Sequence, residues 1–441
     1  MLNVTLLIKF IACLAGLAIS IASFRTSWWN KSPLSKLLLL GFSWRYIFFF
    51  AWFVLLSGSV SGDVRGYDMH TRWIIDGLVP NRDFNTPYGF YLNYFNSFIY
   101  SFWKNPIALV GTYQICELFG SYGIAILLSK YVNIRFARHY LILYCFNPLV
   151  ISWFAFDGQE ESLLIPFISL LLFCHFKNFS RIAGIVSSIM IFFVKASSLL
   201  VSAPFIILDR LRKDGVSFFL LASAFLSVLP ISLGSRIFSS TFSRLNNEGD
   251  QLNTLIMPGN LWFVARKFGL DLSDSPIPKI TLLICFTLLV ILIWLHPRRS
   301  NTLLQISIAC ILSTLVYQIF SPYTSPGFLA VIVPFISVSL LCMHFSQAIY
   351  SPSIYSLTLL WSLISSLDMP VYFRLTKELK QYVVGQSISL RWLGDTFVAW
   401  QLLIVLTNIC LLLILLKFYL KNQFSNLEFD KSVSTVVTTH P

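Results

Sequence analysis

The feature that most constrains this sequence is a series of separate apolar runs that continues along nearly its whole length. Most runs approach the ~20 residues that a helix needs to cross a hydrocarbon core about 30 Å thick. The pattern predicts an all-α polytopic integral membrane protein with about 11–13 transmembrane helices. We expect the spans at residues 4–24, 45–61, 107–129, 139–156, 160–176, 182–196, 198–208, 216–234, 279–296, 302–320, 326–345, 353–367 and 397–420.

The composition excludes a soluble globular domain. Hydrophobic residues make up 56% of the chain and charged residues 12%. That charged share is about half of what soluble domains carry, so a soluble globule of this composition would have too little polar surface to stay dissolved. The eight cysteines lie singly inside candidate spans, which indicates neither a zinc site nor a disulfide framework.

Two neighbouring runs, 182–196 and 198–208, are too short to cross a bilayer separately. They meet at Lys195-Ala-Ser-Ser198. We interpret them as one broken or re-entrant pair of helices around this point.

The positions of lysine and arginine predict the orientation, because cytoplasmic loops retain these residues. With the N-terminus outside, the short basic segments lie inside, and the first run is an uncleaved helix. This orientation makes residues 1–420 one multi-pass domain, with outer segments 62–106, 235–278 and 368–396 and a short cytoplasmic tail, 421–441. The net charge of +13 is then a signal of topology, and we expect no nucleic-acid partner.

The polar groups that a membrane protein retains gather on the predicted outer face. Asp63 directly follows the second span, at the mouth of any cavity between helices. It serves there either as a functional carboxylate or as a helix N-cap or ion-pair partner of Arg65 or Arg72. Asp83 follows twenty residues later in the same outer segment.

An aromatic segment follows in the same outer region. Residues 90–103 contain eight aromatic side chains and no charge. Aromatic rings favour the depth of the lipid headgroups, so the segment either guides a lipid substrate or anchors the protein at the interface.

The fourth and fifth spans meet outside in a second polar segment, residues 147–162. If the fifth helix starts near Gly158, Asp157 is a candidate N-cap. Capping does not readily explain Glu160 and Glu161 as well, beside Gln159. These side chains are therefore candidate site residues.

Cations are also expected on this face. Lys195 lies at the outer end of its span, where it either extends its ammonium to the interface or binds a phosphate at headgroup depth. Arg236 and Arg244 begin the second outer segment, and a further outer turn, 320–327, contains Tyr323.

One acid is placed differently. Glu117 falls near the middle of the third span, in a polar stripe with Tyr113, Gln114 and Ser121. An intramembrane acid is either functional or holds the bundle together through a hydrogen bond between helices.

In their order along the chain, these elements resemble the GT-C superfamily of polytopic glycosyltransferases. Asp63 and Tyr67, followed by Gly77-Leu78-Val79-Pro80-Asn81-Arg82-Asp83-Phe84, are similar to the first outer loop of that family, with its G-x-x-PYRDF-like run. Three later elements continue the resemblance over residues 45–345. They are Asn147-Pro148 leading to Gly158-Gln159-Glu160, the Lys195 to Pro204 helix, and Phe320-Ser321-Pro322-Tyr323. The chain departs from the family pattern at Asn81 and at Thr86-Pro87-Tyr88, and residues 242–251 are only loosely similar to the family's Arg-Gly stretch.

The resemblance implies an inverting transfer of a hexose, such as mannose, from a polyprenyl-phosphate carrier to a glycan or lipid acceptor. We expect Asp63 to be the catalytic base, since an aspartate near its normal pKa of about 4 is ionised at pH 7. The remaining assignments are Asp83, Gln159 and Glu160 as acceptor or second-carboxylate residues, Lys195 and Arg244 as donor-phosphate residues, Tyr67 and Tyr323 as lining residues, and a divalent Mg or Mn as a candidate cofactor.

Two other functions stay open at this point. A transporter or flippase of lipid-linked sugars would explain Glu117 and the broken 182–208 region. A polysaccharide polymerase or ligase would share the outer-face site. The expected location is the cell envelope's inner membrane in a bacterium or the endoplasmic reticulum membrane in a eukaryote.

Overall fold

The computed structural model describes residues 2–50, 62–86, 88–207, 214–235, 260–270, 272, 275–295, 302–321, 327–345, 351–366 and 391–420. Over these residues the chain is helical, and its β-type pairing is limited to an isolated bridge between Pro80 and Phe84. The expectation of an all-α fold is confirmed.

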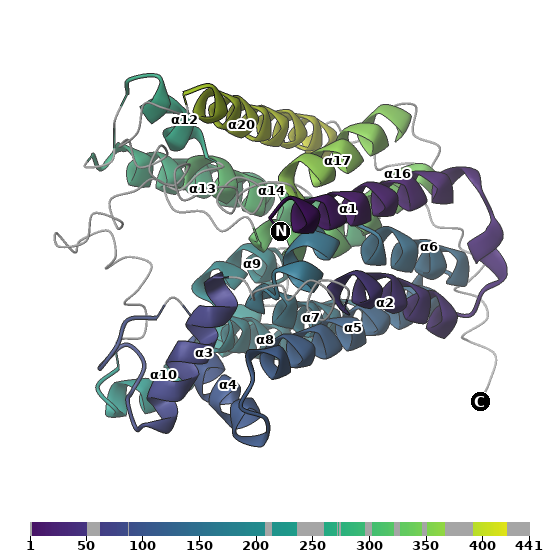
Figure 1. Cartoon of the computed structure of the whole chain (residues 1–441). Coiled ribbons are helices and arrows are strands. Elements are labelled where there is room, and N and C mark those ends of the chain that lie inside the picture. Colours follow the sequence, from purple (N-terminus) through teal and green to yellow (C-terminus); the bar gives the residue numbers. More distant parts are fainter. Residues whose placement is uncertain are drawn as a thin grey trace, which may run out of the picture.

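Most of the long helices run roughly parallel to one another and form a bundle (Figure 1). In the first half of the chain, the elements are α1 (Leu2–Arg25), η1 (Trp28–Lys31), α2 (Leu34–Phe50), α3 (Gly62–Ile75), α4 (Phe90–Phe102), α5 (Pro106–Tyr131), α6 (Ile134–Cys145), η3 (Val150–Phe156), η4 (Glu160–Leu163), α7 (Leu164–Lys177), α8 (Ser180–Phe193), η5 (Ala196–Ser198) and α9 (Leu199–Ile207). In the second half they are α10 (Asp214–Ser232), α12 (Leu261–Lys267), α13 (Ile277–Leu295), α14 (Thr302–Phe320), α15 (Phe328–Val331), α16 (Val333–Phe345), α17 (Ser351–Ser366) and α20 (Arg391–Leu420).

Five of the described helices are long and apolar enough to cross a bilayer, which indicates a membrane-embedded protein. These stretches are Ile8–Arg25, Asp214–Ser232, Ile277–Leu295, Leu303–Phe320 and Val398–Leu420. The bent pair α6 and η3 makes a sixth if it is counted as one span. The larger number of 11–13 crossings stays a prediction.

The core of the bundle lies around α14. Of its apolar stretch, 89% is buried inside the protein, against 11% for α10. Helices α9, α13, α16 and α20 pack around α14. The apolar surface of α10 is instead left facing outward, as expected for a helix at the lipid boundary.

The predicted break near Lys195 is confirmed. Helix α8 ends at Phe193, the short 3-10 turn η5 follows, and α9 begins at Leu199. Lys195 is the N-cap residue of η5, with an extended backbone. Its side chain therefore leaves the chain between two helices.

The predicted span at 139–156 is broken by a sharp bend. Helix α6 ends at Cys145, and the π-helical segment η3 departs from it at an angle of 65°. Pro148 supplies the physical reason, because it has no N–H and disfavours a helical backbone at Asn147. The Asn147 side chain accepts a hydrogen bond from the Leu149 N–H at 2.9 Å, which closes the turn.

The second span also begins earlier than predicted. Helix α2 starts at Leu34, so Arg45 lies well inside a helix and not in a basic loop before residue 45. Arg45 is buried, with 3% of its surface exposed. It is therefore not one of the solvated loop cations that indicate orientation.

The predicted first outer segment contains two helices, α3 and α4. Helix α4 buries Leu92, Asn96 and Tyr100 on one face and leaves Phe98 and Phe102 exposed on the other. Exposed aromatic side chains on an otherwise packed helix agree with placement at the membrane interface.

Candidate site at one end of the helix bundle

A cluster of buried charged groups lies where α3, η4 and the break between α8 and η5 meet. The Lys195 ammonium contacts Glu160 Oε1 at 2.8 Å and Glu161 Oε1 at 2.9 Å. The Tyr67 hydroxyl donates a hydrogen bond to Glu160 Oε2 and accepts one from the Glu160 N–H. We call Tyr67, Glu160, Glu161 and Lys195 the outer cluster, after the face on which the sequence predicts them.

The two carboxylates are deeper than the ammonium. Glu160 and Glu161 are 1% and 0% exposed, whereas 18% of the Lys195 side chain is exposed. Two carboxylates share one ammonium, so these three side chains together carry an excess of one negative charge when ionised. Ions this deep persist only when they are paired, and Lys195 is the group through which an approaching ligand would reach them.

The backbone turn at Gly158 brings η4 to this place. Gly158 has a φ of +63°, a conformation that residues with a side chain rarely adopt. A Cβ there would lie 2.8 Å from Val110 Cγ2 and 3.2 Å from Val64 Cγ2. Glycine thus lets the turn lie directly against α5 and the first turn of α3.

Helix α4 packs equally closely on the end of α8. The Gly89 N–H donates to the Val194 carbonyl at 2.9 Å, immediately before Lys195. A Cβ on Gly89 would lie 2.4 Å from the Phe193 carbonyl oxygen. The chain break that carries Lys195 is therefore held by the start of α4.

Tyr67 is fixed by aromatic neighbours. Its ring packs edge-on against Tyr88 and Tyr113, with centroid separations of 4.7 and 5.9 Å. The Tyr113 hydroxyl in turn donates to Asn96 of α4 at 2.7 Å. The predicted lining residue Tyr67 is thus a buried, oriented partner of Glu160.

Gln159 lies beside the cluster, and it takes the N-cap position of η4 that the sequence had suggested for Asp157. The N-cap expectation for Asp157 is therefore wrong. The Asp157 carboxylate instead pairs with Lys9 of α1 at 2.7 Å, with both side chains buried. The ion pair ties α1 to the segment that carries Glu160.

Asp83 has a different environment. Its carboxylate accepts hydrogen bonds from the Arg82 guanidinium at 2.7 and 2.9 Å and from the Val79 N–H at 2.7 Å. These donors, Arg82 first, lower the pKa of Asp83 to about 2. Neither partner belongs to the outer cluster. The described contacts of Asp83 therefore stabilise the loop in which it lies.

Two hydrogen bonds join that loop to the residues that follow α10. Arg82 also donates to the Leu233 carbonyl at 3.3 Å, and the Ser235 hydroxyl donates to the Pro80 carbonyl at 2.7 Å. The predicted first and second outer segments therefore meet at the same end of the bundle.

Four residues that the sequence analysis named for the site have side chains outside the described part of the structure. Asp63 is the second residue of α3, and its side chain lies outside the described part of the structure. Arg244 and Tyr323 both lie outside the described residues, as does Arg236. Among the side chains that are described, no group of three or more His, Cys, Asp or Glu residues could hold a metal ion.

Glu117 has a bonding partner on each of two other helices. Arg45 of α2 donates to both of its oxygens, at 3.0 and 2.9 Å, and the Tyr144 hydroxyl of α6 donates to Oε1 at 2.6 Å. Of the two interpretations of this acid, these contacts favour the bond between helices.

Two of these ion pairs, Lys9 with Asp157 and Arg45 with Glu117, were not predicted from the sequence. Lys9 lies within an apolar run, and a cation in such a place is a signal for a buried partner. Arg45 is the first residue of the predicted span 45–61, whereas its helix begins at Leu34, so its burial was not expected. In both cases the partner is distant in sequence, 148 residues away for Lys9 and 72 for Arg45.

No protein-family model matches the chain, and no curated protein matches it either.

Proposed function

We propose that the protein is a glycosyltransferase that uses a polyprenyl-phosphate-linked sugar, with its site at the end of the bundle that holds the outer cluster. The observation that carries the proposal is that the buried carboxylates of Glu160 and Glu161 pair with Lys195, and that the first turn of α3 packs beside the turn that leads into them. Lipid-linked donors bring a phosphate to headgroup depth, where a partly exposed cation such as Lys195 is suited to receive it.

The chemistry needs few protein groups. The acceptor hydroxyl oxygen attacks C1 of the sugar, the bond from C1 to the phosphate oxygen breaks, and the acceptor's proton passes to a carboxylate. The lipid phosphate leaves with the bonding electron pair. Asp63 is our candidate for the base, because the neighbouring Val64 packs against the Gly158 turn that leads into Glu160.

The pairing of Lys195 limits how it can bind a phosphate. An anion that approaches the ammonium also approaches Glu160 and Glu161, and like charges at short range repel. We therefore propose that Lys195 contacts the phosphate through its exposed side while it keeps at least one glutamate. For Glu160 and Gln159 we propose a role in binding hydroxyl groups of the sugar or the acceptor.

The test is the Asp63→Asn variant, assayed with purified protein and the donor that the wild type uses. The asparagine is nearly isosteric and cannot accept the proton, so turnover should fall by roughly 10²–10⁴ while donor binding survives. Asp76→Asn changes an exposed carboxylate in the same segment and should leave turnover unchanged.

Two other results would revise the proposal. Full activity in Asp63→Asn together with a loss in Glu160→Gln or Asp83→Asn would mean that the base is misassigned. Full activity in all three variants would remove the mechanism. The alternatives are then a transporter of lipid-linked sugars, which moves the intact donor across vesicles, or a polymerase or ligase, which needs a long acceptor.

A further inference from the structure

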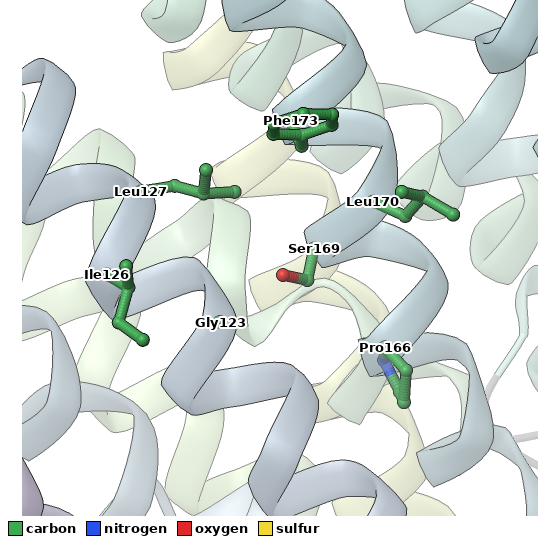
Figure 2. A pocket seen from close by; sticks show the side chains of 7 residues that line it. All are labelled: Gly123, Ile126, Leu127, Pro166, Ser169, Leu170 and Phe173. Atoms are coloured by element: carbon green, nitrogen blue, oxygen red, sulfur yellow. The ribbon is translucent and has the colours of Figure 1, made fainter.

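A groove lies on the surface of the bundle between α5 and α7. Figure 2 shows Leu127 and Ser169 pointing into the space between the two helices, with Phe173 toward one end. Its volume is about 380 Å³. The residues that line it are Gly123, Ile126, Leu127, Pro166, Ser169, Leu170 and Phe173.

Small residues create the groove. A Cβ on Gly120 would lie 2.4 Å from the Pro166 nitrogen, and one on Gly123 would lie 2.5 Å from Ser169 Oγ. The two helices thus contact each other at these positions. Because glycine and serine have small or no side chains, the space outside the contact is left unfilled. The larger side chains of Ile126 and Phe173 then form the walls.

Two cations lie on the same two helices, beyond the residues that line the groove. One helical turn beyond Ile126 and Phe173 are Lys130 on α5 and Lys177 on α7. Their ammonium groups lie 5.8 and 6.0 Å from the centroid of the same ring, that of Tyr131. Phe176 stacks on that ring at 4.6 Å, which joins the two helix ends. Both lysines are exposed, and within the described residues neither forms an ion pair.

We propose that this groove binds an anionic phospholipid, with an acyl chain between α5 and α7 and the phosphate between Lys130 and Lys177. An apolar groove that leads toward two cations with no ion-pair partner among the described residues is complementary to a molecule with a hydrocarbon chain and a negative head. Basic pockets between transmembrane helices bind anionic headgroups in this way, especially on the cytoplasmic side. Lys130 and Lys177 both belong to the segments that the positive charges predict to be cytoplasmic.

The experiment measures lipid retained by the purified full-length protein, by native mass spectrometry after incubation with mixed phosphatidylcholine and phosphatidylglycerol. Wild type should retain phosphatidylglycerol preferentially. The Lys130→Gln/Lys177→Gln variant should reduce this preference by roughly 30-fold, about fivefold for each lysine, because each cation near an anionic membrane surface contributes about that much attraction. The matched control is Lys31→Gln/Lys36→Gln, two exposed cations on the same predicted face, which should behave as wild type.

A second variant tests the groove itself. Ile126 is 46% exposed, so Ile126→Trp narrows the groove without entering the packed contact between the helices. It should reduce retention of both lipids, whereas the lysine variant reduces only that of phosphatidylglycerol. Equal phosphatidylglycerol retention in wild type and the lysine variant would overturn the proposal. So would displacement of the lipid by soluble glycerol phosphate, which has the charge but no chain.

Discussion

Replacing Lys195 with methionine should destabilise the protein, because the methionine keeps the length of the side chain but leaves Glu160 and Glu161 without their shared cation. Both carboxylates are almost fully buried, and Lys195 lies within 2.9 Å of each. Removing one partner of a buried ion pair typically costs about 3–5 kcal/mol. We expect about 3 kcal/mol here, at the lower end, because 18% of the Lys195 side chain is exposed and water already screens the ammonium.

Adding a second substitution to Lys195→Met distinguishes the effect of the lost charge from that of the changed side-chain shape. Lys195→Met/Glu161→Gln returns the cluster to its original net charge, and Glu160 still accepts the hydrogen bond from Tyr67. This double variant should regain most of the lost stability. Equilibrium unfolding in mixed micelles of a mild detergent and dodecyl sulfate, followed by tryptophan fluorescence, measures each variant against wild type.

The same variants test the phosphate role of Lys195. The double variant should be folded, so its donor affinity can be compared with that of Glu161→Gln alone. If Lys195 contacts the donor phosphate, the double variant binds the donor more weakly. A cost below about 1 kcal/mol for Lys195→Met, or no recovery in the double variant, would refute the argument that Lys195 neutralises buried carboxylates.

Three further predictions concern other parts of the chain. Arg45→Met and Glu117→Gln should each destabilise by about 3–5 kcal/mol, with the double variant costing less than the sum in the same unfolding assay; additive costs would contradict a direct pair. Gly158→Ala should cost at least roughly 1–2 kcal/mol from its left-handed backbone alone and should reduce turnover, whereas an unchanged melting temperature would contradict this packing. Asp83 has a pKa lowered from 3.8 to about 2, so its contacts stabilise the fold at neutral pH and are lost as the pH falls from about 4 through about 2. The melting difference between wild type and Asp83→Asn should therefore shrink over that interval, and a constant difference would contradict it.

The sequence was sufficient for features that depend on neighbouring residues. The helical class follows from the length of the apolar runs, and the break at Lys195 follows from two runs that are each too short. The bend after Cys145 was missed, although Asn147-Pro148 contains its cause, because the apolar character continues through it. A hydropathy pattern reports burial in lipid or protein and does not report the direction of the chain.

The sequence could not predict which side chains of the site contact one another. Topology predicted that Tyr67, Glu160 and Lys195 lie on one face, but only packing determines that they touch. Asp83 was expected on the same face, and in the structure its carboxylate is held by Arg82 of its own loop. The predicted topology limits which residues are candidates for the site. The packing of helices that are distant in sequence then determines which of these candidates come together.

The measurement that tests the central proposal most directly is release of polyprenyl phosphate by the purified protein from a panel of polyprenyl-phosphate hexoses, mannose included, in the presence of glycan and lipid acceptors. The proposed transferase releases lipid phosphate from at least one donor, with inversion at C1 of the transferred sugar. The Asp63→Asn variant should slow that release by roughly 10²–10⁴ and still bind the donor. Movement of the intact donor across vesicles, without release from any member of the panel, would contradict the proposal and identify a transporter.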